Sequence, residues 1–427
     1  MKNFLSLSTF LILFYAMANT FFIAEILYAD NTVPSLSEDH CLTCHREMGI
    51  LPSGFNENDI HMQPGLSCSG CHGGNPASDD PEVAMSPKNG FAGVPTRAEI
   101  PQFCGKCHSS INFMRTYRPR IQTDQVEQYY TSVHGKKLRL KDQKVAECVS
   151  CHTSHAIFSV KDARSTVYPL NVPNTCKKCH SDPDYMKEYH IPTDQFARYA
   201  TSVHGMDLLE NKDTGAPACN DCHGNHGATP PGVESVSHVC GNCHVNNLNY
   251  FTASPMAEPF EQLDVHACEQ CHGNHGVQKT SDEMVGVGES SVCIACHDAG
   301  DNGYHAAEQI HHQIKTFVNL YDSAQVRLKD VQQKGMDDVD ILFLLQEANQ
   351  DLIHSRTLVH TFDPSKVAAK AGEGIKKTNE AIVLERQEVK DYHTRRRGFG
   401  IATLFITVLA VALFFKIRDM EKLRKKG

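Results

Sequence analysis

Apolar residues recur with helical spacing through the C-terminal third of the chain. Beyond residue 302 they are separated alternately by four and three positions, the pattern of an amphipathic helix. One stripe comprises Ile310, Ile314, Phe317, Tyr321, Ala324, Leu328 and Val331, and a second comprises Ile341, Leu345, Ala348, Leu352, Ser355, Val359 and Phe362. Gly335 separates the two helices, and Asp363 with Pro364 begins a third. We therefore expect long amphipathic helices over residues 303–397, packed as a helical hairpin against the preceding domain or forming a dimer interface.

Two long, mainly apolar segments lie near the ends of the chain. Residues 1–29 predict a secretory signal, either cleaved after Ala18 or Ala29 or retained as an anchor. Residues 398–416 begin with an uncharged run long enough to cross a bilayer, although a buried helix can have the same composition. Residues 417–427 are basic, so the positive-inside rule places this tail in the cytoplasm. The ends predict a single-pass protein on the periplasmic face of the bacterial inner membrane.

All 18 cysteines lie between these apolar segments, and each belongs to one of nine Cys-x-x-Cys-His motifs. The cysteine pairs are Cys41 with Cys44, Cys68 with Cys71, Cys104 with Cys107, Cys148 with Cys151, Cys176 with Cys179, Cys219 with Cys222, Cys240 with Cys243, Cys268 with Cys271 and Cys293 with Cys296. The histidines that follow them are His45, His72, His108, His152, His180, His223, His244, His272 and His297. Two thiols at this spacing can attach one haem and the adjacent histidine can bind its iron, so the motifs predict nine covalently bound c-type haems.

Two other chemistries also use paired cysteines. Nine disulfides or a set of structural zinc sites would explain the spacing, but neither requires a histidine after every second cysteine. Motifs this closely spaced leave little polypeptide for a conventional core. We therefore expect residues 30–302 to form a nonahaem cytochrome c domain, mainly α with much irregular structure, in which short helices and loops wrap around the cofactors.

The motifs after the first are arranged in pairs that repeat. "YYTSVHG" at 129–135 precedes "CVSCHTSH" and then "CKKCH", whereas "YATSVHG" at 199–205 precedes "CNDCHGNHG" and then "CGNCH". A third copy runs from "FTASPMA" at 251–257, and a degenerate copy begins at "NDIHM" around His61. Four dihaem modules and the lone motif at Cys41 account for nine haems.

Each module offers two further histidines as sixth ligands to iron. One precedes the first motif (His61, His134, His204), and one follows its proximal histidine by three residues (His155, His226, His275). Three residues are too few to reach the opposite face of the same haem, so we expect the second histidine to bind a neighbouring haem. Solvated or propionate-bonded histidines are the alternative. Further candidates are His40, His190, His238, His266, His305, His311 and His312.

Two copies depart from this pattern. Met256 stands where His134 and His204 stand in their copies, so one haem has either a methionine ligand or a merely packed methionine at this position. Asn75 occupies the position of His155, so one haem lacks its expected ligand. His354 and His360 lie on the second amphipathic helix, where a structural role is favoured over the alternative that they reach a haem.

The charge of the chain is unevenly distributed. The formal net charge is −9, but residues 395–427 hold nine basic and two acidic residues, which leaves −16 on residues 30–394. So acidic a region argues against nucleic-acid binding and favours a basic redox partner, although it also suits a merely soluble surface.

The "SVHG…CxxCHGxHG…CxxCH" modules resemble the dihaem repeats of bacterial multihaem c-type cytochromes. Clustered haems followed by long C-terminal helices are similar to the nitrite reductase and hydroxylamine oxidoreductase superfamily. The resemblance implies stacked haems that relay electrons between a membrane quinol-oxidising component and periplasmic or outer-membrane acceptors, among them other cytochromes.

One departure from that superfamily bears on catalysis. Ammonia-forming nitrite reductases typically carry a Cys-x-x-Cys-Lys site, and all nine motifs here end in histidine. We therefore expect an electron-transfer protein with no catalytic residue. A multihaem oxidoreductase acting on a small nitrogen or sulfur compound at one open haem is the alternative, and a homo-oligomer through the C-terminal helices is a further prediction.

Overall fold

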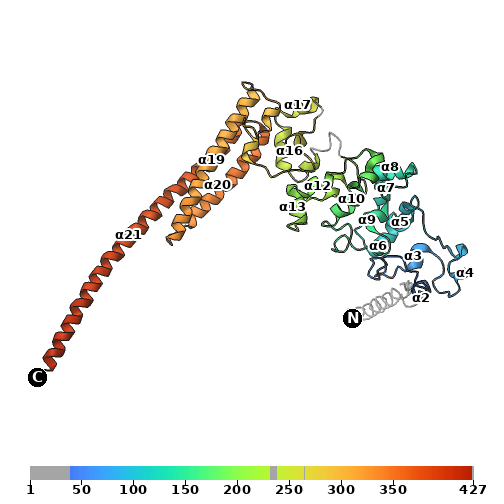
Figure 1. The fold of residues 1–427 in the computed structure, drawn as a ribbon, viewed down its shortest axis with the longest axis horizontal. Helices are drawn as coiled ribbons and strands as arrows, with labels where there is room; N and C mark the ends of the chain where they lie inside the picture. The colour runs from blue at the N-terminus through green and yellow to red at the C-terminus, as the bar shows by residue number, and fades with distance from the viewer. Residues whose placement is uncertain (1–38, 231–237, 264, 426–427) are drawn as a thin grey trace, which may run out of the picture. The chain divides into compact units, whose positions relative to one another are not determined.

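All regular structure in the described part of the chain is helical, as expected (Figure 1). The computed structural model describes residues 39–230, 238–263 and 265–425, so the signal segment predicted at 1–29 lies outside the described residues. The chain divides into two compact units, residues 1–196 with 204–230 and residues 197–203 with 231–427. Each unit is described separately below.

The first unit consists of short helices joined by long loops. Its helices are α2 (His40–Glu47), α3 (Cys68–His72), α4 (Pro81–Ala84), η2 (Pro87–Asn89), α5 (Ile100–His108), α6 (Ile111–Tyr117), α7 (Gln125–Thr131), α8 (Val133–Arg139), α9 (Cys148–His152), α10 (Val172–His180), α11 (Pro183–Met186), η3 (Lys187–Tyr189) and α14 (Cys219–His223). The chain passes between the units within α12 (Gln195–Ala200) and at the start of α13 (Val203–Leu209). Across the two units, seven Cys-x-x-Cys-His motifs lie within a helix or at its end. Six of these helices are in the first unit, and the seventh is α18 (Ala267–His272) in the second.

The helix that carries the first motif of each sequence copy ends in a sharp turn. The residue after the proximal histidine has a left-handed φ at Gly73 (71°), Thr153 (65°), Gly224 (79°) and Gly273 (71°). Glycine adopts this conformation readily, which explains the "CHG" sequence, whereas the β-branched Thr153 is an outlier. The chain therefore changes direction just before the position three residues beyond the motif, which is a histidine in three copies and Asn75 in the fourth.

The "TSVHG" sequence places a histidine in the first turn of a helix. The Ser132 hydroxyl accepts a hydrogen bond from the Gly135 amide at 2.9 Å and donates one to the Tyr129 carbonyl at 2.5 Å. Ser132 therefore caps α8. A Cβ at Gly135 would overlap the Tyr129 carbonyl, so only glycine lets α8 approach α7 this closely. Ser132 and Gly135 together therefore position His134.

The second unit combines short helices with a three-helix bundle. The short elements are α16 (Val245–Thr252), α17 (Ala257–Gln262), η4 (Asp282–Met284), η5 (Cys293–Ala295) and η6 (Val359–Thr361). The bundle is formed by α19 (Asn302–Gln333), α20 (Val339–Leu358) and the first half of α21 (Pro364–Arg424), which Figure 1 shows side by side. The two predicted apolar stripes supply its core, including Phe317, Val331 and Leu345. The stripes therefore pack against each other and α21, rather than forming the simple hairpin or dimer interface expected.

Two contacts attach α21 to the bundle. A Cβ at Gly374 would overlap the Phe317 ring, so this glycine admits the largest buried side chain of the core. The buried Asp351 carboxylate on α20 pairs with Lys370 at 2.7 Å and with Lys377 at 2.9 Å, both on α21. Burial alone would raise the pKa of Asp351, but hydrogen bonds from the two lysines outweigh it and lower that pKa.

Helix α21 continues without a break beyond the bundle. It contains the run predicted to span the membrane at 398–416, and the side chains there are exposed. Within the described residues it is the one helix long and apolar enough to cross a bilayer, which is consistent with a single-pass anchor.

Candidate functional site

Successive Cys-x-x-Cys-His motifs lie next to one another in the first unit. The thiols of Cys104 and Cys148 are hydrogen-bonded, as are those of Cys176 and Cys219. The thiols of Cys71 and Cys107 are also neighbours. These contacts join the motifs in the same order in space as in the sequence.

The same adjacency extends to other motifs. Cys41 interacts with Cys68, and burial with the neighbouring Cys176 raises the pKa of the Cys151 thiol to about 11. In the second unit, burial and the neighbouring Cys293 raise the pKa of Cys271. All 18 cysteines are free of disulfides, so the disulfide alternative finds no support. Within the described residues no three metal-binding side chains converge as structural zinc would require.

The second cysteine of a motif is often open to solvent. Five of the nine second cysteines are exposed, namely Cys44, Cys71, Cys222, Cys243 and Cys296. Cys179 is only partly exposed, and its thiol lies beside the Tyr185 hydroxyl, which donates a hydrogen bond to the Lys144 carbonyl. Thioether attachment requires the thiol to reach a vinyl group of haem, and the exposed cysteines are accessible for this reaction. Cys179 would have to give up its contact with Tyr185.

Two motifs of the second unit depart from the helical geometry of the others. Their second cysteine follows the helical segment and donates its amide to the carbonyl of the first cysteine, at 3.2 Å for Cys243 to Cys240 and 3.2 Å for Cys296 to Cys293. A bond to the third preceding residue is the 3₁₀ type, which makes a tighter turn than the α-helix. The sequence spacing is the same in all nine motifs and did not predict this difference.

Five of the motif histidines face a second histidine at nearly the same distance. The ring centres are 6.0 Å apart for His61/His108, 6.2 Å for His72/His155, and 6.1 Å for each of the remaining pairs, which are His134/His180, His152/His226 and His272/His360. Two imidazoles that bind one iron from opposite faces have ring centres roughly 6 Å apart, because a metal–nitrogen bond of about 2 Å and a ring radius of about 1.1 Å each count twice. The donor pairs therefore fit haem with two histidine ligands.

Four of the six extra histidines predicted as ligands occur in these pairs, and their partners follow a rule. His61 and His134, which precede the first motif of their copies, face the proximal histidine of the second motif in the same copy. His155 and His226, which follow the first motif, face the first proximal histidine of the preceding copy. His155 and His226, each three residues past a motif, thus lie opposite the proximal histidine of another motif.

A backbone hydrogen bond recurs beside these histidines. The donor is the amide of the residue just before the first extra histidine of a copy. The acceptor is a carbonyl in the next copy, two residues after the second extra histidine of that copy. The three bonds are Ile60 to Ile157 at 2.7 Å, Val133 to Ala228 at 3.2 Å, and Val203 to Val277 at 2.9 Å. "NDIHM" around His61 therefore makes the same connection as the two "TSVH" sequences.

Hydrogen bonds orient several of the imidazoles. Nδ1 lies 2.9 Å from the Gly93 carbonyl at His72, 2.9 Å from the Thr357 carbonyl at His360, and 3.0 Å from the Asp59 carboxylate at His61. A carbonyl can only accept, so Nδ1 carries the proton and Nε2 keeps its lone pair. Such partners commonly fix a metal-binding histidine in its ligand tautomer.

Burial favours the neutral form of several of the paired imidazoles. Burial lowers the pKa of His108, His134 and His226, and it lowers the pKa of His152 to about 4, with His226 adding to the effect. A histidine must be neutral to bind a metal, so burial prepares these side chains for ligation near neutral pH.

The ring planes divide the pairs into two groups. They are nearly parallel in His72/His155 (16°), His152/His226 (18°) and His272/His360 (25°). They are strongly rotated in His134/His180 (57°) and perpendicular in His61/His108 (89°). The first motif of a copy thus has parallel rings, and the second has rotated rings.

The remaining two predicted ligands, His204 and His275, occupy equivalent positions in their copies. His204 lies in the first turn of α13, as His134 does in α8, and His275 follows α18 as His226 follows α14. Among the described residues, neither His45 nor His297 has a second imidazole at about 6 Å, the distance expected across one iron. His297 instead has Nδ1 3.2 Å from the Asp301 carboxylate.

The further histidine candidates have other partners. His40 pairs with Asp79, His266 lies 3.6 Å from Glu269, and His305 lies 3.9 Å from Glu308. His311 directs Nδ1 to the Asp282 carbonyl at 3.1 Å, and His190 has a left-handed φ of 54°.

His360, which the sequence favours as a structural residue, lies opposite a motif histidine. It faces His272 with the same separation as the predicted pairs, although it lies in η6. Helical spacing explained its position in the sequence and concealed this contact. The sequence did contain one indication of this contact. The last copy has no following copy, so the partner of His272 had to come from another part of the chain.

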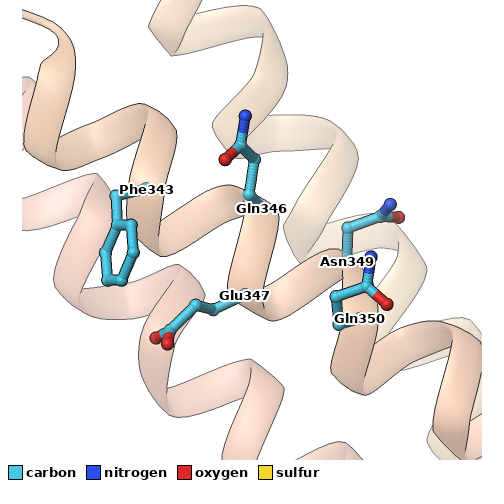
Figure 2. Close-up of a pocket in the computed structure, with 5 residues that line it drawn as sticks. All are labelled: Phe343, Gln346, Glu347, Asn349 and Gln350. Atoms are coloured by element: carbon cyan, nitrogen blue, oxygen red, sulfur yellow. The ribbon is translucent and has the colours of Figure 1, made fainter. Parts of the chain in front are cut away.

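A hollow on α20 offers no comparable chemistry. It has a volume of about 300 Å³ and is lined by Phe343, Gln346, Glu347, Asn349 and Gln350. Figure 2 shows these side chains spread along one helix without converging on a point. The histidine pairs are therefore the candidate site.

Residues 60–181 match the family model described as Cytochrome c3. This segment includes four Cys-x-x-Cys-His motifs together with His61, His134 and His155. The match supports a multihaem c-type cytochrome with covalently bound haems and an electron-transfer role. No curated protein and no solved structure matches the chain.

Proposed function

We propose that the chain is a membrane-anchored nonahaem cytochrome that relays single electrons along a row of haems. Bound haem would supply the one-electron chemistry, with an axial ligand that influences its potential. The protein would attach each haem through two cysteines, hold its iron between two side chains and set the order of the row. Four dihaem modules preceded by one single motif organise this row.

The observation that carries the proposal is the set of histidine pairs at 6.0–6.2 Å. A histidine on each face leaves no position for a substrate at that iron, which favours electron transfer over catalysis. Because His155 and His226 lie opposite motifs of the preceding copy, each would link two modules through one haem. The thiol contacts between successive motifs support the same sequential order.

The ends of the chain suggest where the row operates. The exposed apolar part of α21 suits a membrane anchor, with the basic tail in the cytoplasm and residues 30–397 in the periplasm. Anchoring would hold the protein near a quinol-oxidising membrane component. The net charge of −16 on residues 30–394 would attract a basic acceptor, such as another cytochrome.

The exposed face of α20 bears on self-association. Val339, Phe343 and Ile353 are apolar and exposed on this helix, whereas its buried side faces the bundle. A homo-oligomer through the C-terminal helices would use this face and not the two predicted stripes, which are already buried.

A second candidate function is suggested by the motif at Cys41, Cys44 and His45. By the pairing rule, the residue opposite His45 would come from the position that Asn75 occupies. The Asn75–Pro76 segment does lie beside this motif, since the His40 amide donates to the Pro76 carbonyl at 2.9 Å. An amide is a poor ligand for haem iron compared with imidazole. This haem would be open to a small ligand, as an oxidoreductase site requires.

Intact-mass and ligand-binding measurements on the purified full-length protein test the proposal. Nine added haems and no turnover of nitrite, hydroxylamine or a sulfur oxyanion are expected for a relay. Fewer than nine haems would reject the attachment count. Rapid turnover of any of these compounds would favour the oxidoreductase.

A further inference from the structure

The pairing rule leaves one proximal histidine without a following sequence copy. His72 faces His155 and His152 faces His226, and in both cases the partner comes from the next copy. His272 carries the first motif of the last copy, so no later copy can supply its partner. The helical bundle supplies His360 instead.

The His272/His360 pair matches the pairs made between copies. Its ring centres are 6.1 Å apart and its planes are 25° apart, compared with 6.2 Å and 16° for His72/His155 and 6.1 Å and 18° for His152/His226. Burial lowers the pKa of both His272 and His360. The Thr357 carbonyl, 2.9 Å from Nδ1 of His360, fixes the tautomer that leaves Nε2 for a metal.

The surroundings of η6 hold His360 in place. Leu358 and Val359 pack against a core cluster of Ile310, Ile314 and Val367 from α19 and α21. The Phe362 ring contacts Phe251 of α16 at 6.3 Å in an edge-to-face arrangement. The imidazole is therefore presented by a rigid part of the bundle.

We propose that His360 is the sixth ligand of the haem held by Cys268, Cys271 and His272, and that the bundle thereby caps the haem row. The inference rests on the proposed function, because it requires haem at this motif. Terminal units of repeat proteins commonly differ from the internal units because they must complete the last repeat. Here a coordination bond would also join the last module directly to η6, between α20 and the membrane-directed α21.

A structural role for His360 is the alternative to be rejected. Its Nε2 lies 3.5 Å from the Asn247 side-chain nitrogen, at the outer limit of a hydrogen bond. His354 provides a matched control on the adjoining helix, since it contacts the Tyr250 hydroxyl at 3.2 Å and stacks on that ring at 6.5 Å. A bundle histidine that only packs should behave like His354.

The test compares His360→Ala with His354→Ala in the full-length holoprotein. We expect His360→Ala to convert one haem in nine from low spin to high spin, measured by magnetic circular dichroism, and added imidazole to reverse the change. His360→Met should instead keep that haem low-spin and add a near-infrared methionine-to-iron band. His354→Ala should retain the wild-type spectrum.

The His226→Ala variant distinguishes an error in the proposed role of His360 from an error in the proposed function. If His226→Ala produces one high-spin haem and His360→Ala, with nine haems attached, produces none, His360 is not a ligand. If neither variant changes the spin state, the pairing rule itself is wrong. Absence of the methionine band from a correctly loaded His360→Met protein would also overturn the proposal.

Discussion

Glu385 is a buried carboxylate without a hydrogen-bond partner in the three-helix bundle. Its side chain is nearly inaccessible, and neither carboxylate oxygen accepts a hydrogen bond from the protein. Burial raises the pKa of Glu385 from 4.5 to about 7, although Arg327 and Arg386 oppose the change. A difference of this size corresponds to about 3 kcal/mol, at about 1.4 kcal/mol per pH unit.

The direction of the pH effect follows from the two pKa values. Because the folded bundle holds the proton more tightly than the unfolded chain, its stability is greatest below pH 4.5 and falls as the pH rises to about 7. Glu385→Gln removes the titration. Between pH 5 and pH 8, the free energy needed to open the wild-type bundle should decrease by up to about 3 kcal/mol. In the Glu385→Gln variant this free energy should decrease by almost nothing.

Hydrogen exchange of the full-length protein measures this opening directly. After correction for the intrinsic exchange rate, amide protection in α19–α21 should fall about a hundredfold in the wild type over this pH range, which is the same free energy expressed as a ratio. Glu380→Gln, an exposed change on the same helix, should leave the wild-type fall intact. An equal fall in the Glu385→Gln variant would refute the reasoning.

Two further predictions concern haems without a paired histidine. The pairing rule places Met256 opposite the His297 haem. The oxidised protein should therefore show a near-infrared methionine-to-iron band, and Met256→His should abolish it. Absence of this band from the wild type would exclude the methionine ligand. Asn75→His should supply the missing ligand at the His45 haem and remove a cyanide-binding, high-spin signal. Cyanide titration of both proteins checks this, and equal binding would show that Asn75 does not face that iron.

The placement of some candidate ligands could be anticipated from local spacing. A histidine three residues past a motif is too near to reach the opposite face of the same haem, and His155 and His226 lie opposite motifs of the preceding copy. The apolar stripes were also predicted correctly, because burial of Ile310, Phe317 and Leu345 follows directly from helical periodicity. Both conclusions depend on interactions within or next to one element.

The remaining features depend on contacts between distant segments. His360 is far from His272 in the sequence, and its helical position offered a sufficient structural explanation. The third helix was predicted to begin at Asp363 and Pro364, but its packing into a bundle was not, and Gly372 and Gly374 disfavour a helix in isolation. At Gly374 the missing side chain admits the Phe317 ring, so tertiary packing compensates for low helix propensity.

Low-temperature electron paramagnetic resonance of the fully oxidised protein tests the central claim most directly. The relay requires at least five low-spin haems with two histidine ligands, corresponding to the five observed pairs. Ring orientation governs the anisotropy of the ferric signal, so the three nearly parallel pairs should give rhombic spectra and the perpendicular His61/His108 pair a strongly anisotropic one. A spectrum dominated by high-spin iron, from protein with all nine haems attached, would contradict the account.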